Sequence, residues 1–384
     1  MSASPLTTSF MLSAGEASGD LHGAQLARAL RALAPAVRLT GMGGFRMAEA
    51  GVGLLEDLTR LAVVGGSEAV GRLPRLYRAY RTLARAMAET RPRGLVLIDF
   101  PEFNLLLARV AKRLGIPVIY FVPPQVWAWR RGRVKRIARL VTKVLAVFPF
   151  EVPLYRSAGV PVEFVGHPLL DSLPRALDRA EARRRMVLPE GSTLVGLLPG
   201  SRREEVERLL GPMTEAATRI QDAWPDVRFA LALAPTVKPE AVAPAVTACP
   251  AKIDVLSGRT HEIMAAADLL LIASGTATLE AACLGTPMVV CYRVSRFSEL
   301  IGRLLIRIPW ISLANIVANR AVVPELIQDD ATGERLAQEA LSLLREPGRL
   351  AAQREALSGI RAELGEPGVG ERAARCVLAV AGER

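Results

Sequence analysis

A turn rich in glycine, serine and threonine is the part of this 384-residue sequence best suited to binding an anion. Leu269–Ala273 is a short apolar run typical of a buried strand, and residues 274–276 (Ser-Gly-Thr) separate it from a helical pattern that begins at Ala277. This order directs backbone N–H groups and the positive end of a helix dipole to one point, which suits a phosphate. Glu280 lies four residues after Thr276, where it could accept hydrogen bonds from sugar hydroxyls. An ordinary capped helix with a solvated Glu280 is the alternative.

A carboxylate at a strand end is the second candidate for chemistry. The apolar run Gly94–Asp99 ends in an acidic residue, and Glu102 and Asn104 follow in the segment FPEFN. Ligands of open α/β sheets bind at the carboxyl ends of the strands. Asp99 is therefore a candidate general base. The alternative is an aspartate that caps the next helix.

The segment LLPGSRREEV supplies a positive charge at a comparable turn. Residues 193–198 are expected to form a strand, and a helix is expected from Arg202. Ser201 with Glu204 three residues later predicts a capping box. Arg202 and Arg203 could point into an interdomain cleft, where an arginine can bind a departing diphosphate through two hydrogen bonds.

These candidate residues need a scaffold, and the order of elements predicts an α/β protein with two Rossmann-like domains. The first would span residues 1–175 and the second residues 190–345, joined by a hinge in the polar, arginine-rich stretch 171–191. Helices over residues 346–384 could cross back to the first domain.

The first strand, over residues 9–14, leads into the glycine-rich segment GEASGDLHG. It matches neither a dinucleotide fingerprint nor a Walker A loop. Glu16 and Asp20 bring negative charge there, which favours hydroxyl or backbone contacts over a diphosphate. A helix capped by Ser18 is the alternative. His167, in the segment GHP, marks either a strand end or a functional position.

Composition restricts the function further. The net charge of +11 indicates an anionic partner: a nucleic acid, an acidic membrane surface or a phosphorylated substrate. The four cysteines form no C-x-x-C pair, and no Asp-x-Asp or His/carboxylate cluster has metal-ligand spacing. We therefore expect reduced thiols, no metal and no cofactor. No signal peptide and no apolar run of about 20 residues is present, which predicts a cytoplasmic protein with at most peripheral membrane contact.

Three segments could contact a membrane or another anion. In residues 72–87, an apolar stripe at helical spacing faces away from five arginines, as in helices that lie on anionic membranes. A surface helix of a globular core is the alternative. Residues 296–310 repeat the combination. The segment PPQVWAWRR joins Trp127 and Trp129 to arginines, which would suit single-stranded nucleic acid or lipid headgroups. The low aromatic content of 5% and the absence of a recognisable module argue against nucleic acid.

Several motifs, taken in order, make the sequence resemble the lipid-A-disaccharide synthase family (glycosyltransferase family 19) over nearly its full length. They are AGEASGD (14–20), IDFPEFN (98–104), PPQVWAWR (123–130), FPFE (148–151), GHP (166–168), LLPGSRREEV (197–206), SGTATLE (274–280) and LANIVANR with VVPEL (313–326). The sequence departs from the family pattern at Ala314, where proline is usual, and at Asn319, where glycine is usual.

The resemblance implies a GT-B fold, with two Rossmann-like domains facing across a cleft, and an inverting transfer. UDP-2,3-diacylglucosamine would be the donor and 2,3-diacylglucosamine 1-phosphate (lipid X) the acceptor. Asp99 would be the general base, and Arg202 would stabilise the departing diphosphate. The donor site would comprise Ser201, Arg202, Ser274, Gly275, Thr276, Glu280 and Asn315. The acceptor side and cleft would comprise Glu16, Ser18, Gly19, Asn104, Gln125 and Trp127.

The resemblance also implies a peripheral enzyme on the cytoplasmic face of the inner membrane, with no nucleic-acid partner. It leaves acyl-chain length and oligomeric state open, a homodimer included. Two other functions stay open on the residues alone. A UDP-N-acetylglucosamine 2-epimerase would share the fold class, and a non-catalytic binding protein for a membrane surface or nucleic acid would explain the charge.

Overall fold

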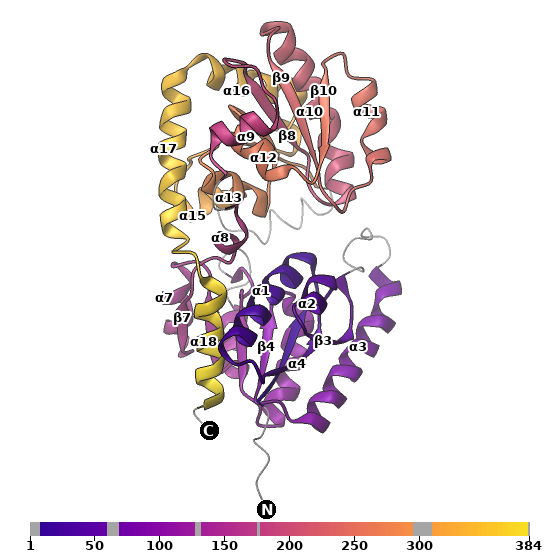
Figure 1. Ribbon diagram of the computed structural model, residues 1–384, viewed down its shortest axis with the longest axis vertical. Coiled ribbons are helices and arrows are strands. Elements are labelled where there is room, and N and C mark those ends of the chain that lie inside the picture. The colour runs from indigo at the N-terminus through magenta and orange to yellow at the C-terminus, as the bar shows by residue number, and fades with distance from the viewer. Residues whose placement is uncertain (1–7, 60–68, 127–131, 175–176, 295–308, 383–384) are drawn as a thin grey trace, which may run out of the picture. The chain divides into compact units, whose positions relative to one another are not determined.

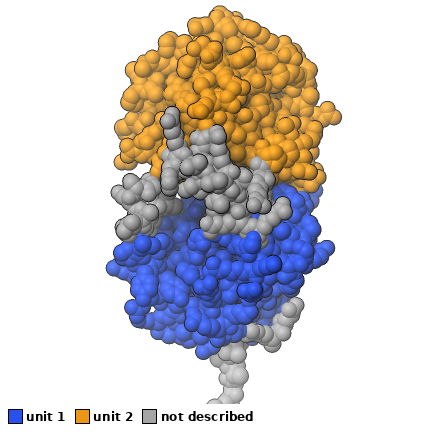
Figure 2. All heavy atoms as spheres, turned by 180° about the vertical axis from the view of Figure 1, so that it is seen from behind, with its two compact units in different colours: residues 1–172, 364–384 blue, residues 173–363 orange. Residues whose placement is uncertain are grey.

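The computed structural model describes residues 8–59, 69–126, 132–174, 177–294 and 309–382. The chain divides into two compact units (Figure 2). Unit 1 comprises residues 1–172 and 364–384, and unit 2 comprises residues 173–363.

Unit 1 contains a seven-stranded sheet in the order β3-β2-β1-β4-β5-β6-β7, and every neighbouring pair is parallel. Its strands are β1 (Ser9–Ala14), β2 (Arg38–Met42), β3 (Gly53–Glu56), β4 (Gly94–Ile98), β5 (Val118–Phe121), β6 (Lys143–Ala146) and β7 (Val162–Phe164). Its helices are α1 (Ala17–Leu33), α2 (Phe45–Glu49), α3 (Ala69–Thr90), α4 (Pro101–Arg113), α6 (Gly132–Leu140), α7 (Glu151–Ser157), α8 (Leu169–Ser172) and α18 (Val369–Gly382). The strand order reverses between β1 and β4, the place where such sheets bind ligands.

The chain's last helix, α18, belongs to unit 1 and packs against α1 (Figure 1). Asp171 fixes its start, because its carboxylate accepts hydrogen bonds from the backbone N–H groups of Gly368 (2.6 Å) and Gly370 (2.8 Å). Arg372 donates to the carbonyl oxygen of Val165 at 2.9 Å. Residues 346–363, in contrast, stay with unit 2.

Unit 2 contains a six-stranded parallel sheet in the order β10-β9-β8-β11-β12-β13. Its strands are β8 (Leu194–Leu198), β9 (Arg228–Leu233), β10 (Ile253–Ser257), β11 (Leu269–Ala273), β12 (Met288–Tyr292) and β13 (Glu325–Ile327). Its α-helices are α9 (Arg179–Arg185), α10 (Arg203–Ala223), α11 (Ala243–Thr247), α12 (Thr260–Ala266), α13 (Thr276–Cys283), α15 (Leu313–Ala318), α16 (Gly333–Arg345) and α17 (Pro347–Glu363), and two short 3-10 turns span Pro239–Ala241 and Gln328–Asp330.

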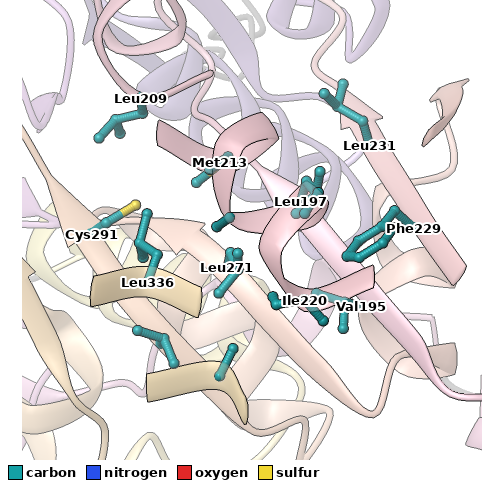
Figure 3. Close-up of a cluster of buried hydrophobic side chains, with 14 of the residues drawn as sticks. Val195, Leu197, Leu209, Met213, Ile220, Phe229, Leu231, Leu271, Cys291 and Leu336 are labelled. Carbon is teal, nitrogen blue, oxygen red and sulfur yellow. The ribbon is translucent and has the colours of Figure 1, made fainter. Parts of the chain in front are cut away.

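Continuous apolar runs explain the central strands of both sheets. β4, β8 and β11 are buried at every position, as expected of parallel strands covered on both faces. In unit 2 the apolar faces of α10 and α16 cover one side of the sheet, and Met213 and Leu336 are fully buried there (Figure 3). The strand ends that carry the candidate residues are therefore held by a packed core.

Most of the stretch 171–191, where a hinge is expected, belongs to unit 2. Unit 2 begins at Leu173, and the arginine-rich part of the stretch forms α9. Arg183 donates to the carbonyl oxygens of Ser192 (2.6 Å) and Ala266 (3.2 Å), and its guanidinium pairs with Asp268. Arg183, one of the arginines of that stretch, therefore has its partners within unit 2.

The apolar stripe of α3 does not share one environment. Leu83 and Met87 are fully buried in the core of unit 1, whereas Leu73 and Tyr77 are 60% and 61% exposed. The other expected membrane element, residues 296–310, lies mostly outside the described residues, as does Trp127. No helix in the described part of the chain is long and apolar enough to span a bilayer.

Candidate active site

The Ser-Gly-Thr turn lies at the carboxyl end of β11, and α13 begins at Thr276, one residue earlier than expected. Gly275 adopts φ +156° and ψ −164°, a backbone conformation that residues with a side chain rarely adopt. A Cβ at this position would meet no atom within 4 Å, so the backbone conformation and not the available space favours glycine. Gly275 and Thr276 are exposed. The turn therefore presents the helix N-terminus to solvent, as a phosphate site requires.

Glu280, one turn into α13, contacts a residue that the sequence did not single out. Its Oε2 lies 3.1 Å from Nε2 of His261, on α12. Both side chains are partly buried, at 24% and 32% exposure. No spacing rule relates a glutamate to a histidine 19 residues earlier, so only the packing of α12 against α13 reveals the pair.

The turn after β8 differs from the expected capping box by one residue. Arg202 is the N-cap residue of α10, and Glu205 rather than Glu204 closes the turn. The Glu205 carboxylate accepts from the backbone N–H groups of Ser201 (3.2 Å) and Arg202 (3.3 Å), and it pairs with the Arg202 guanidinium at 2.9 Å. Gly200 makes this possible with φ +118°. The Arg202 side chain stays 67% exposed and can reach an anion.

Asn315 lies on α15 and is only 1% exposed. Its Oδ1 accepts from the backbone N–H groups of Val322 (2.7 Å) and Val323 (2.9 Å). Its Nδ2 donates to the carbonyl oxygen of Val323 (2.9 Å) and to Glu325 Oε1 (2.8 Å). Both the oxygen and the NH₂ group of this amide are thus used inside the protein, where they hold the loop over residues 322–325 against α15.

Glu325, another residue that the sequence did not single out, connects α15 to the Ser-Gly-Thr turn. Besides Asn315, its carboxylate accepts from the backbone N–H groups of Ile311 and Ser312, each at 2.9 Å. Ile311 returns a contact to the turn, because its carbonyl oxygen accepts the Ser274 hydroxyl at 3.0 Å. The motifs SGTATLE and VVPEL therefore form one hydrogen-bonded network.

The two departures from the family pattern fit this local geometry. Ala314 is in the first turn of α15, where proline is also tolerated. Asn319 ends that helix in the left-handed conformation, with φ +49°, which asparagine adopts more readily than other residues apart from glycine. Neither substitution requires a different backbone.

In unit 1, Asp99 follows β4 in a left-handed conformation (φ +48°), and Phe100 does the same (φ +45°). Two such residues in succession store strain of the kind found at functional sites. Phe100 is the N-cap residue of α4 and no side chain caps that helix, so Asp99 is not a helix cap. Asn104 and Tyr120 hold its backbone: the Asp99 carbonyl oxygen accepts from Asn104 Nδ2 (2.7 Å) and from the Tyr120 hydroxyl (3.0 Å).

Asn104 is fully buried and joins three segments at the sheet's switch point. Its Oδ1 accepts the Ser13 hydroxyl at 2.6 Å, and its Nδ2 also lies 3.2 Å from the carbonyl oxygens of Ser13 and Ile98. Its hydrogen bonds, like those of Asn315, hold neighbouring backbone segments together.

The remaining residues expected on the acceptor side are not all equivalent. Glu16 caps α1 in place of Ser18, although without a side-chain bond, and is partly exposed. Ser18 and Gln125 are exposed, whereas Gly19 is buried. Asp20 is buried against α2, where its carboxylate accepts from three backbone N–H groups: Gly44 (2.7 Å), Met47 (3.0 Å) and Arg46 (3.1 Å).

Two further groups of unit 1 were missed or left open by the sequence. Arg133 pairs with Glu102 near Tyr120. Burial, and after it the charge of Asp99, raises the pKa of Tyr120 well above its usual range.

The GHP and FPFE segments meet where the centre of the His167 ring lies 5.1 Å from the centre of the Phe148 ring. His167 Nδ1 accepts the backbone N–H of Leu169 at 3.2 Å, and burial and His22 lower the pKa of His167 to about 3.

Comparison with known proteins places this chain in a family. A family model described as lipid-A-disaccharide synthetase matches residues 10–380. The lipid-A-disaccharide synthase of Geobacter sulfurreducens is 45% identical over 374 residues, which are 97% of each chain.

Two solved structures share the architecture. A putative UDP-N-acetylglucosamine 2-epimerase from Listeria monocytogenes superposes with a TM-score of 0.69 and 13% identity, covering 98% of this chain and 97% of that one. The glycotransferase of kitacinnamycin gives a TM-score of 0.67 and 18% identity, covering 98% of this chain and all (100%) of that one. At such identities the likeness shows only the fold, two parallel-sheet α/β units of the GT-B type. The near-complete family match carries the assignment: this chain belongs to the lipid-A-disaccharide synthetase family and is a glycosyltransferase that forms the lipid A disaccharide.

Proposed function

We propose that this protein transfers 2,3-diacylglucosamine from UDP to the 6-hydroxyl of 2,3-diacylglucosamine 1-phosphate (lipid X), with inversion. The products are the β-1,6-linked disaccharide 1-phosphate and UDP. The observation that carries the proposal is the strained, doubly anchored Asp99 at the switch point of unit 1, in a chain whose family forms this disaccharide.

Asp99 is the general base of the proposed reaction. Its carboxylate takes the proton of the acceptor 6-hydroxyl while that oxygen forms a bond to C1 of the donor sugar. The bond between C1 and the diphosphate breaks, and UDP leaves with the electron pair. Glu16, Ser18 and Gln125 lie on the acceptor side, and Asn104 and Tyr120 keep the Asp99 backbone in place.

The donor belongs to unit 2 in this proposal. Backbone N–H groups at Gly275 and Thr276 and the dipole of α13 face the diphosphate, and the exposed Arg202 guanidinium stabilises the developing negative charge. Ser201 adds a hydroxyl, and Glu280 accepts from the ribose. The positive charges are already part of the chain, so we propose that the reaction needs neither a cofactor nor a metal.

A product assay tests this function. The purified protein is mixed with UDP-2,3-diacylglucosamine and lipid X in detergent with EDTA, and UDP and disaccharide are both quantified. Equal amounts of the two are expected. UDP without disaccharide would contradict the acceptor, and activity that disappears in EDTA and returns with Mg²⁺ would contradict metal independence.

Matched variants test the residue roles. Asp99→Asn should lower kcat by about 10² to 10⁴ while leaving the Kd for UDP unchanged, because the base touches only the acceptor. Arg202→Ala should lower kcat and weaken UDP binding. Interconversion of UDP-N-acetylglucosamine epimers without lipid would instead support the epimerase function. Lipid binding without turnover would support a non-catalytic binding protein.

We also propose peripheral binding of unit 1 to the cytoplasmic face of the inner membrane. Leu73 and Tyr77 are 60% and 61% exposed on α3, and Arg75, Arg78 and Arg81 are exposed beside them. Exposed apolar side chains among arginines suit the surface of an anionic bilayer. In this proposal the anionic partner of these arginines is therefore lipid and not nucleic acid.

Flotation with vesicles of phosphatidylethanolamine and phosphatidylglycerol tests membrane binding. Leu73→Ser with Tyr77→Ser should reduce the bound fraction, and Val187→Ser, at an 85% exposed site in unit 2, should not. If the wild type, the double variant and Val187→Ser bind vesicles equally, this surface of α3 is not the membrane-binding one. Size-exclusion chromatography with light scattering decides whether the protein is a homodimer.

A further inference from the structure

We propose that His261 is a positioning residue for nucleotide recognition. His261 holds the Glu280 carboxylate in an orientation in which this carboxylate accepts hydrogen bonds from both hydroxyls of a ribose 2′,3′-diol. His261 would then determine how strongly the protein prefers a ribonucleotide over a 2′-deoxyribonucleotide. The inference rests on the proposed donor site in unit 2 and names a determinant of its specificity.

The first support is the contact itself. His261 Nε2 lies 3.1 Å from Glu280 Oε2, and the two side chains come from different helices, α12 and α13. They are 32% and 24% exposed, so the pair is neither a solvated surface contact nor sealed from a ligand. The Glu280 side chain is thus in contact with His261 and still partly accessible to solvent.

Hydrogen bonds also hold α12 and α13, the two helices that carry His261 and Glu280, in place. The Thr286 hydroxyl, just after α13, donates to the carbonyl oxygen of Met264 on α12 at 2.7 Å. Arg361 of α17 donates to the carbonyl oxygen of Cys283, the last residue of α13, at 3.3 Å. With both helices fixed, the main remaining freedom is rotation of the Glu280 side chain, and the imidazole restricts it.

The third support is the hydrogen-bonding capacity of the carboxylate. An ionised carboxylate offers about four lone-pair directions on its two oxygens. Among the described residues, His261 is the only side chain that hydrogen-bonds to Glu280. A single N–H from His261 therefore orients the group and leaves capacity on both oxygens for two hydroxyl donors.

The position along α13 matches a nucleotide. Glu280 lies one turn from Thr276, at about 5–6 Å between Cβ atoms, on the same helix face as the proposed phosphate site. In a nucleoside diphosphate the ribose follows the α-phosphate directly. A carboxylate one turn beyond the phosphate-facing N-terminus is placed for the sugar hydroxyls, not for the base or the diphosphate.

Calorimetry on the full chain tests the inference with UDP and 2′-deoxy-UDP as probes. The wild-type protein should bind UDP about tenfold more tightly than 2′-deoxy-UDP, since the deoxy compound leaves one acceptor of Glu280 unpaired. His261→Ala should reduce this ratio to about two, as should Glu280→Gln. The double variant should reduce it no further, because both residues act through one carboxylate.

Two more variants separate positioning from general stability. His261→Gln keeps an N–H donor and should retain most of the discrimination. Glu262→Gln neutralises the neighbouring carboxylate, which pairs with Arg259 at the start of α12, and should leave the preference for UDP over 2′-deoxy-UDP unchanged. In the transferase assay, His261→Ala should raise the donor KM with kcat within about twofold, because the ribose does not react.

The outcomes distinguish two failures. A wild-type protein that does not bind UDP would overturn the proposed function and this inference together. UDP binding in which His261→Ala keeps the full preference for UDP, while Glu280→Gln loses it, would overturn only the role of His261. Equal losses for UDP and 2′-deoxy-UDP in folded His261→Ala and His261→Gln proteins would assign His261 a purely structural role.

Discussion

The hydroxyl of Tyr120 donates a hydrogen bond of 3.0 Å to the backbone carbonyl oxygen of Asp99. Tyr120 is fully buried on β5, the strand next to β4, and Asp99 directly follows β4. Burial and the charge of Asp99 raise the pKa of this phenol well above its usual range, so it remains a donor at any working pH. The contact thus links the candidate base to the core of unit 1.

Tyr120→Phe should lower kcat about fivefold with little change in the Kd for UDP. The substitution removes one hydrogen bond, worth about 1 kcal/mol, from a strained backbone that must keep the Asp99 carboxylate aimed at the acceptor. Steady-state kinetics with varied lipid X measures the effect.

Tyr155→Phe is the matched control for that variant. Tyr155 is equally buried on α7, but its hydroxyl makes only a 3.5 Å contact with the carbonyl oxygen of Pro124. Its loss should leave kcat within twofold. Equal effects of the two substitutions would show that the Tyr120 contact does not position the base.

Gly275→Ala should weaken UDP binding by about tenfold or more. A Cβ at this position meets no atom, so any effect comes from the backbone conformation, whose strain costs about 1–3 kcal/mol for a residue other than glycine. Isothermal titration calorimetry gives the change in Kd.

Gly359→Ala controls for a change of glycine to alanine as such. Gly359 is inside α17, also with open space around a Cβ, and alanine should stabilise the helix by up to about 1 kcal/mol. If both variants bind UDP like the wild type, the turn does not hold the phosphates in the conformation seen here.

Glu325→Gln should weaken UDP binding and lower the thermal stability of unit 2. The amide places an NH₂ group against the N–H donors that the carboxylate now satisfies, at a cost of about 1–3 kcal/mol. Because Ile311 holds the Ser274 hydroxyl, the disturbance should reach the phosphate turn. Glu334→Gln, at an exposed site on α16, should change neither quantity.

His167 should remain neutral far below the usual range of histidine. Its pKa falls from 6.5 to about 3, first because of burial and then because of His22. The unfolded chain takes up a proton below pH 6.5 that the folded chain refuses, so the stability present above pH 6.5 is lost as the pH falls toward 3. Between pH 6.5 and 5 this one group destabilises unit 1 by about 2 kcal/mol.

Proton–carbon NMR of the three histidines checks that behaviour, with His167→Gln to assign the signal. The His167 resonance should not titrate between pH 8 and 5. A midpoint near 6.5 would show that the ring is accessible and charged in the folded protein. The variant should also lose less stability than the wild type on acidification.

Local sequence patterns predicted an element correctly where its residue types favour only one kind of structure. The apolar runs before Asp99 and Ser274 predicted β4 and β11, and the glycine and hydroxyl residues predicted the turn before α13. The strand at Glu325 and the helix at Asn315 were not expected, because runs this short have no readable periodicity. The capping box was misplaced by one residue because Glu204 and Glu205 are indistinguishable by composition.

The sequence by itself determined the α/β class, the strand ends that carry Asp99, Arg202 and the Ser-Gly-Thr turn, and the family. Tertiary structure alone decided which of the motif side chains are buried with their hydrogen bonds used inside the protein and which remain exposed. Asn104 and Asn315 are motif residues, yet both are buried with their amides occupied, whereas His261, Tyr120 and Glu325 became relevant only through contacts. The physical reason is that a hydrogen bond depends on distance in space, and strands and helices far apart in sequence set that distance only once their apolar faces are packed.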